Sequence, residues 1–248
     1  MLESLKVRIF ADGADLDHIR MLAANPLVKG FTTNPTLMRK AGVADYERFG
    51  RDLLATVIDR PVSLEVFADD FPTMIAQAEA IASWGANAVI KIPITTTRGE
   101  FCGPVIRALV TQGIAVNVTA MLTLGQVARV TACLDAAVPA ILSVFAGRIA
   151  DTGHDPVPVM RRALEMMAPL PKAQLLWASP RELLNVFQAD EIGCHIITVT
   201  SDLLAKLSMV GRDLEEYSLD TVRMFHRDAT ASNYSIQVAA PQARVTAS

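Results

Sequence analysis

The chain has 248 residues, a formal net charge of −3 at pH 7 and 51% hydrophobic residues, which is enough apolar material for one large core. Acidic and basic residues are mixed, and no basic run is longer than the two residues of Arg161-Arg162, so we expect no nucleic-acid and no membrane partner. The three cysteines are far apart and form no CxxC pair. Together with the absence of a signal-peptide pattern, this spacing predicts a cytoplasmic protein.

Eight short runs rich in Val, Ile, Leu, Phe and Thr predict buried strands. In chain order they cover residues 7–12, 30–34, 62–67, 88–93, 114–120, 140–146, 174–179 and 195–200. Helical periodicity is found in segments that include residues 71–84, 123–137, 161–167, 181–189, 203–209 and 215–226.

Strand and helix alternating eight times predict a parallel sheet. The regular unit length, and the absence of a glycine-rich dinucleotide loop after the first strand, favour an α/β fold of the (β/α)8 TIM-barrel type over a doubly wound sheet. We therefore expect one barrel with a C-terminal helical extension over residues 1–236, and a flexible tail over residues 237–248.

Lys91 stands alone among the apolar residues of the strand predicted at 88–93. Burial disfavours the ammonium form of lysine, and a neutral amine can attack a ketone to form a Schiff base. On this strand alone, an equally good interpretation is a structural lysine that reaches water from the strand end. The polar residues of the neighbouring strands distinguish between a catalytic and a structural lysine.

Polar residues gather near the carboxyl ends of the predicted strands, which is where the active site of a (β/α)8 barrel lies. Each has a structural alternative: Asp12 could cap a helix, and Glu65 could simply neutralise Lys91. As a set, they favour aldol cleavage and condensation, with Lys91 forming the Schiff base and Asp12 moving the proton of the C4 hydroxyl. Glu65 would act on the carbinolamine through a water molecule held by Thr119. Asn34 and Ser143 could bind sugar hydroxyls, and Arg148, Ser179 and Arg181 could bind a phosphate.

Five segments resemble the transaldolase family. They are Gly-Phe-Thr-Thr-Asn-Pro-Thr-Leu at 30–37, Val-Ile-Lys-Ile-Pro at 89–93, Asn-Val-Thr-Ala at 117–120, Phe-Ala-Gly-Arg-Ile-Ala-Asp at 145–151 and Ala-Ser-Pro-Arg at 178–181. The likeness extends over residues 7–207. It implies a barrel enzyme of carbohydrate metabolism and the pentose phosphate pathway, with sugar-phosphate substrates, no metal and no organic cofactor. It also implies a homo-oligomer, from dimer to decamer.

The resemblance implies that Lys91, Asp12, Glu65 and Thr119 are catalytic. The substrate-binding residues that it implies are Thr33, Asn34, Asn117, Ser143 and Phe145, and the phosphate-binding residues are Arg148, Ser179 and Arg181.

Two positions separate branches of the family. Members that act as fructose-6-phosphate aldolases carry Gln where this chain has Glu65 and Tyr where it has Phe145, so the resemblance favours a transaldolase over an aldolase that releases free dihydroxyacetone. Pro180 and residues 199–202 depart from the usual pattern near the expected phosphate end, which leaves the acceptor sugar open. A non-catalytic barrel that binds sugar phosphates is a more distant alternative.

Overall fold

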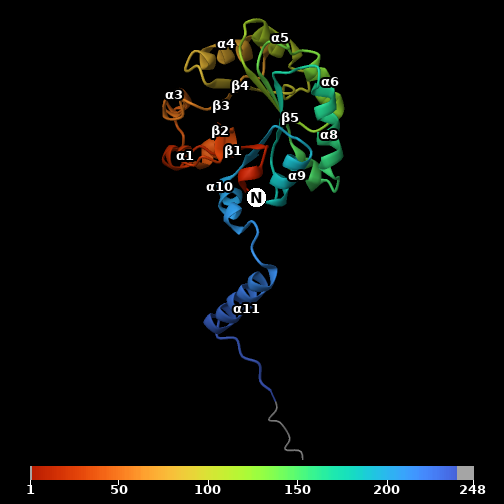
Figure 1. The fold of residues 1–248 in the computed structure, drawn as a ribbon. Coiled ribbons are helices and arrows are strands. Elements are labelled where there is room, and N and C mark those ends of the chain that lie inside the picture. Colours follow the sequence, from red (N-terminus) through yellow and green to blue (C-terminus); the bar gives the residue numbers. More distant parts are fainter. Residues whose placement is uncertain (1, 239–248) are drawn as a thin grey trace, which may run out of the picture. The chain divides into compact units, whose positions relative to one another are not determined.

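The structure is a computed structural model that describes residues 2–238, and eight parallel strands form its central feature (Figure 1). They close into a barrel in chain order, with β8 pairing to β1. All eight predicted strands are present and no end is displaced by more than two residues, so the predicted TIM barrel is confirmed. The strands are β1 Arg8–Asp12, β2 Val28–Thr32, β3 Val62–Glu65, β4 Ala88–Pro93, β5 Val116–Met121, β6 Ala140–Val144, β7 Ala173–Trp177 and β8 Ile196–Val199.

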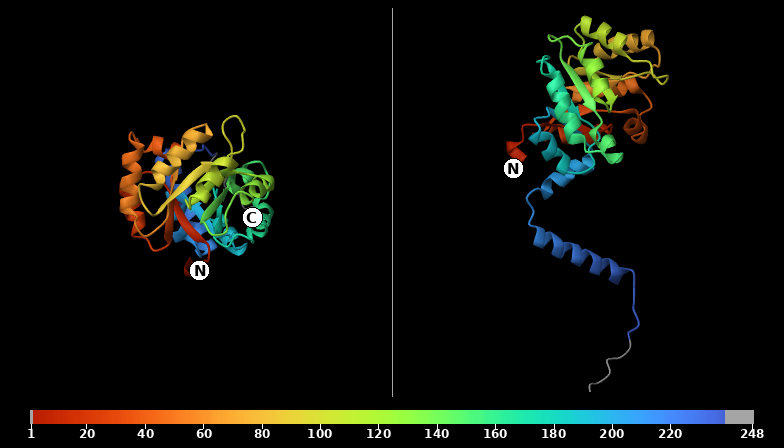
Figure 2. Two further views of the ribbon diagram at one scale, coloured as in Figure 1. Left: turned by 90° about the horizontal axis from the view of Figure 1, so that it is seen from above. Right: turned by 90° about the vertical axis from the view of Figure 1, so that its right-hand side faces the viewer.

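Helices lie outside the strands of the barrel, as the view from above shows (Figure 2). Many begin at a polar side chain that accepts a hydrogen bond from the first turn, such as Asp15, Asp45, Asp70 and Thr123. The helices are α1 Leu16–Ala23, α2 Pro35–Lys40, α3 Tyr46–Thr56, α4 Phe71–Ala82, α5 Gly103–Thr111, α6 Leu124–Thr131, α7 Ala146–Asp151, α8 Pro156–Met167, α9 Leu184–Glu191 and α10 Ser201–Ala205.

Two boundaries differ from the prediction for physical reasons. β2 ends two residues earlier than residue 34 because Asn34 caps α2, where its side chain accepts from Leu37 N. The helix predicted over 181–189 begins only at Leu184, because the backbone N–H groups of Arg181 and Glu182 donate to the Asn185 side chain instead. In both places an asparagine side chain accepts a hydrogen bond from a backbone N–H group near the start of a helix, and this local bond sets the boundary of the regular element.

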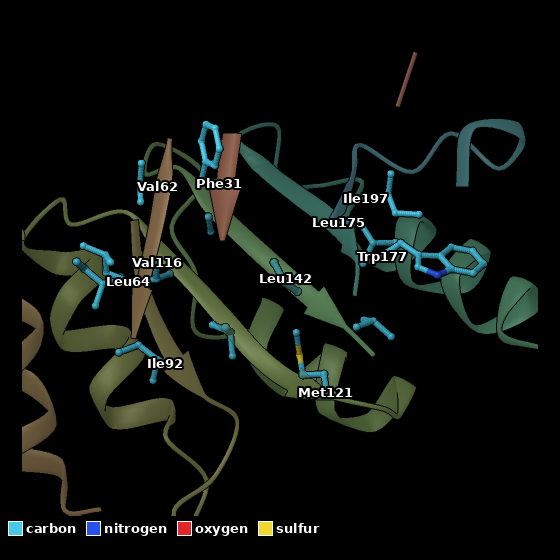
Figure 3. Packing of buried hydrophobic residues seen from close by; sticks show 14 of the residues in the cluster. Phe31, Val62, Leu64, Ile92, Val116, Met121, Leu142, Leu175, Trp177 and Ile197 are labelled. Carbon is cyan, nitrogen blue, oxygen red and sulfur yellow. The ribbon is translucent and has the colours of Figure 1, made fainter. Parts of the chain in front are cut away.

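Apolar side chains form two separate clusters. The larger one packs the outer faces of the strands against the helices and includes Phe31, Leu64, Ile92, Leu142 and Trp177 (Figure 3). The smaller one joins alternate residues of the same strands, which places it inside the barrel; it contains Phe10, Val89, Ile141, Leu176, Ala178 and Ile196.

The inner cluster explains where the polar residues lie. Successive residues of a strand point to opposite faces, so the residue two positions after an inner apolar one also points into the barrel. Those next inner residues are polar on several strands: Asp12 follows Phe10, Lys91 follows Val89, Ser143 follows Ile141 and Thr198 follows Ile196. The interior therefore changes from apolar to polar towards the carboxyl ends of the strands.

The C-terminal residues form a second compact unit, which begins at Met209. Its helix, α11, spans Leu214–Ala231 and begins at Asp213, whose side chain accepts from Glu216 N. Most of the predicted tail, residues 239–248, lies outside the described residues. No helix within residues 2–238 combines the length and the apolar character needed to cross a bilayer.

Candidate active site

A cavity of about 450 Å³ opens at the carboxyl ends of the strands. Ten of the twelve residues predicted for the site line it, and the other two, Thr33 and Asn117, do not. The lining residues from the prediction are Asp12, Asn34, Glu65, Lys91, Thr119, Ser143, Phe145, Arg148, Ser179 and Arg181. The structure thus brings residues from seven strands and their following loops to one mouth.

Lys91 lies at the bottom of this mouth and is 7% exposed. Its Nζ donates a hydrogen bond to the Thr33 carbonyl oxygen at 2.8 Å and lies 3.4 Å from Glu65 Oε2. Glu65 is the register partner of Lys91 on the adjacent strand β3, so the barrel itself sets this pair side by side. Two fixed acceptors therefore orient the amine towards the cavity.

The Thr33 carbonyl is itself held in place by β3. The Thr33 backbone N–H and Oγ1 both bond to the Ser63 carbonyl oxygen, at 3.3 and 3.1 Å. Thr33 is fully buried and thus contacts Lys91 through its backbone, with its side chain turned away from the cavity.

Asn117 lies one layer below the cavity. Its Nδ2 donates to Ser63 Oγ at 3.0 Å, and its Oδ1 accepts from Ser143 Oγ at 2.6 Å. Asn117 and Ser63 have no exposed surface, and Ser143 lines the cavity. Asn117 therefore connects a buried serine on β3 to the serine that faces the mouth from β6.

Asp12 lies across the mouth from the lysine, at the end of β1. Thr32 Oγ1 donates to Asp12 Oδ1 at 2.8 Å, and Asn34 Nδ2 donates to Asp12 Oδ2 at 3.1 Å. Burial raises the pKa of the Asp12 carboxyl group above its ordinary value, and the charge of Lys91 and the two hydrogen bonds oppose this rise only in part. A carboxyl group with a raised pKa is suited to exchange protons nearer neutral pH.

Thr119 presents a buried hydroxyl to the cavity. Its Oγ1 has no hydrogen-bond partner among residues 2–238, although buried polar atoms are nearly always paired. The following residue, Ala120, has φ of 64°, and the pairing of β5 with β6 is irregular at this point. Such an irregularity can re-aim a side chain next to a site, and it leaves the Thr119 hydroxyl available to a bound molecule.

The expected phosphate end combines strained backbone with two arginines. Ser179 has φ of 61°, a left-handed conformation that is rare outside glycine. Gly147 lies so close beneath it that a Cβ atom would come within 1.5 Å of the Ser179 carbonyl oxygen. Arg181 Nε donates to Asp151 Oδ1 at 2.9 Å, and its Nη2 contacts Asp151 Oδ2, which holds the guanidinium group at the rim. The Arg148 guanidinium carbon lies 5.6 Å from the centre of the Phe145 ring.

Three residues of the site were not assigned a role from the sequence. Thr32 and Thr198 both line the cavity, and Ser63 supports Thr33 and Asn117 from below. The signal that could have found Thr198 and Ser63 is the two-residue alternation: each is a polar residue at an inward position of an apolar strand.

A closed (β/α)8 barrel with polar strand ends around one mouth is the architecture of TIM-barrel enzymes. A family model described as Transaldolase/Fructose-6-phosphate aldolase matches residues 9–236. The chain belongs to this family, and it is an enzyme of the transaldolase and aldolase kind.

Curated relatives support this assignment. A protein named "Probable transaldolase" from Dehalococcoides mccartyi is 34% identical over 203 residues, which cover 81% of this chain and 90% of the relative. Another of that name from Desulforudis audaxviator is 33% identical over 215 residues, or 86% of this chain and 94% of the relative. Among solved structures, a 2,3-dimethylmalate lyase has a TM-score of 0.57 at 17% identity and covers 97% of this chain and 89% of its own. This last likeness shows the fold alone.

Proposed function

We propose that the protein is a cytoplasmic transaldolase, which moves a dihydroxyacetone unit from a ketose phosphate to an aldose or aldose phosphate. The observation that carries this proposal is Lys91. Its amine is almost fully buried, lies 3.4 Å from the Glu65 carboxylate, and shares one cavity with Asp12. A salt bridge alone would explain the Lys91–Glu65 pair, but it would not explain the second carboxyl group with a raised pKa at the same mouth.

The first step is the formation of a Schiff base. Glu65, acting through a water molecule bound by Thr119, takes a proton from the Lys91 ammonium group, and the amine then attacks C2 of the ketose. A second amine proton moves to the C2 oxygen to give the carbinolamine, and Glu65 returns the first proton to this hydroxyl group as it departs as water. The unpaired Thr119 hydroxyl supports this role.

Carbon–carbon cleavage follows from the iminium ion. Asp12 takes the proton of the C4 hydroxyl, the C3–C4 bond breaks, and its electron pair moves into the iminium to form an enamine. The shortened aldose phosphate leaves, while the three-carbon enamine stays on Lys91, with its hydroxyls bound by Asn34 and Ser143. Attack of the enamine on the aldehyde of the acceptor, with return of the Asp12 proton to the new hydroxyl, reverses these steps, and hydrolysis then frees Lys91.

The phosphate group would bind at the side of the mouth formed by the segments that follow β6 and β7. Arg148 and Arg181 supply positive charge, and the Ser179 loop supplies a polar edge held in one conformation. Arginine is well suited to bind the oxygens of a phosphate through several parallel hydrogen bonds.

Borohydride reduction in the presence of fructose 6-phosphate tests the proposal. We expect one irreversible three-carbon adduct, located by peptide mass mapping on Lys91, and complete loss of the adduct in Lys91→Met. Lys172→Met is the matched control, because this exposed lysine does not line the cavity and its Nζ donates to the Ala137 carbonyl oxygen. An adduct on another lysine, or none, contradicts the Schiff-base mechanism.

The alternative activity is release of free dihydroxyacetone. Two residues that line the cavity, Glu65 and Phe145, favour transfer, because the phenylalanine ring cannot donate a proton to the bound fragment. We expect transfer to an added aldose to be much faster than release without one, and we expect Glu65→Gln combined with Phe145→Tyr to raise release. Fast release by the parent protein would favour the aldolase activity.

We also propose that the chain forms a homo-oligomer. Taken by itself, α11 buries no residue and carries Leu214, Tyr217, Val222 and Phe225 along one side of the helix. An amphipathic helix of this kind requires a surface to cover its apolar side. Light scattering coupled to gel filtration should give a mass that is a multiple of 26.8 kDa, and a monomeric mass at all concentrations would refute this point.

A further inference from the structure

Three side chains form a continuous hydrogen-bonded row across the mouth. Thr198 on β8 lies 2.6 Å from Thr32 on β2, measured between the two Oγ1 atoms, and Thr32 Oγ1 lies 2.8 Å from Asp12 Oδ1 on β1. β1 lies between the other two strands, pairing with β2 at Asp12–Thr32 and with β8 at Phe10–Thr198. The threonines are 3% and 8% exposed, so their hydroxyl groups have little access to bulk water.

The number of protons fixes the direction of this row. A hydroxyl has one proton to donate, and an ionised carboxylate can only accept. When Asp12 is ionised, Thr32 donates its proton to Asp12, and Thr198 must be the donor to Thr32. Both threonine protons then point towards the carboxylate.

Protonation of Asp12 allows the row to reverse. The other carboxylate oxygen, Oδ2, faces Asn34 Nδ2, which can only donate, so Oδ1 is the oxygen whose partner can change its role. Once Oδ1 carries the proton, it can donate to Thr32, and Thr32 can turn its own proton to Thr198. Thr198 lines the cavity and can direct its proton towards a bound sugar.

We propose that Thr32 and Thr198 are positioning residues for Asp12, a reversible hydroxyl pair that keeps this carboxyl group hydrogen-bonded both before and after it takes the proton of the substrate. This inference rests on the proposed acid–base role of Asp12. The proton balance is simple: the substrate O–H bond breaks, an O–H bond forms at Asp12 Oδ1, and the two threonines only turn. Each threonine keeps its own proton.

Each hydroxyl bonds in both states of the carboxyl group, but the two losses fall mainly on opposite states. Loss of the Thr32 hydroxyl removes the charge-assisted donor of ionised Asp12, which makes protonation easier. Loss of the Thr198 hydroxyl leaves the Thr32 oxygen short of one donor when Asp12 is ionised, but it leaves the buried Thr32 proton without an acceptor when Asp12 is protonated. The second loss costs more, because an unpaired buried donor is costlier than one unused lone pair, so protonation becomes harder. The charged groups that act on Asp12, Lys91 from β4 and Glu65 from β3, are unchanged in both variants.

The test is the pH dependence of single-turnover cleavage of fructose 6-phosphate by Thr32→Val and Thr198→Val. We expect the acid limb to move to higher pH in Thr32→Val and to lower pH in Thr198→Val, each by roughly half to one pH unit, as one hydrogen bond predicts. Thr198→Val should also cleave about tenfold more slowly on the plateau. Thr32→Ser and Thr198→Ser, which keep the hydroxyl, should restore the parental profile.

Shifts in the same direction, or equal profiles for Thr198→Val and Thr198→Ser, would overturn the inference. If Thr198→Val does not fold, Thr198→Ala provides a second variant without the hydroxyl. Borohydride trapping on Lys91 in the parent protein distinguishes failure of the proposed function from failure of the proposed threonine pair. Without that trapping the proposed function fails; with trapping but without opposite shifts, only the role of the threonine pair fails.

Discussion

Replacing Gly147 with alanine should disable the phosphate end of the site. A Cβ atom at this position would lie 1.5 Å from the Ser179 carbonyl oxygen, 2.6 Å from its carbon and 3.2 Å from Arg181 Nε. The two nearest atoms belong to the backbone, which cannot turn away as a flexible side chain would. The Ser179 loop would therefore have to retreat by about 1.5 Å before normal contact is reached.

Two effects of this movement can be measured. A misplacement of about 1 Å can cost roughly 10²-fold in an enzyme site, so we expect KM for fructose 6-phosphate to rise by that order. Overpacking of this kind costs about 1–3 kcal/mol, which corresponds to a fall in Tm of about 2–12 °C for a chain of this size. Trapping of unphosphorylated dihydroxyacetone on Lys91 should persist, because the lysine lies on a different strand.

Gly125→Ala is the matched control. Gly125 lies in α6, and the nearest atom to its added Cβ is Thr123 Oγ1 at 3.9 Å. We expect parental kinetics and a gain of up to about 1 kcal/mol from the better helix former. A Gly147→Ala protein with the parental Tm and the parental KM would refute the assignment of the phosphate to this end.

Three further predictions concern the barrel interior. Gly30→Ala should destabilise the fold by about 1–3 kcal/mol, because the added Cβ would lie 2.5 Å from the Phe10 ring. Phe10→Leu in the same chain should recover part of this loss in denaturant titrations, and an absence of recovery would contradict the contact between residue 30 and the Phe10 ring. Asn117→Leu should cost about 2–4 kcal/mol, because it leaves two buried serine hydroxyls without their partner; an unchanged unfolding midpoint would contradict this. The pKa of Asp12 is raised in the folded protein. Asp12 therefore contributes to stability fully at pH values below about 3.9, its pKa in the unfolded chain, and this contribution is lost as pH rises through its pKa in the folded protein. Asp12→Asn should therefore gain stability relative to the parent as pH rises above about 3.9, whereas a difference independent of pH would refute the burial of this charge.

Much of the site could be predicted from the sequence because its positions follow the regular geometry of strands. Lys91 and Glu65 face each other because their strands are adjacent and in register, and parallel strands bring their carboxyl ends to one rim. The apolar runs placed these strands to within two residues, which was sufficient to collect the polar residues at a single mouth.

The remaining features depend on three-dimensional relations that strand periodicity does not contain. Thr33 acts on Lys91 through its carbonyl oxygen, and a sequence displays side chains rather than backbone direction. Asn117 lies one layer below the cavity, because the stagger between strands decides which inward residue reaches the surface of the mouth. Thr198 meets Thr32 only because β8 and β2 flank β1 after the barrel has closed.

The most direct test of transfer through Lys91 is to follow the three-carbon unit itself. Fructose 6-phosphate labelled with ¹³C at its first three carbons is mixed with the protein and a four-carbon aldose phosphate, and the products are followed by NMR. We predict that the label appears in a seven-carbon ketose phosphate, with little free dihydroxyacetone, and that Lys91→Met forms neither. Label released as dihydroxyacetone at the same rate with and without the acceptor, or transfer that survives in Lys91→Met, would contradict the proposed function.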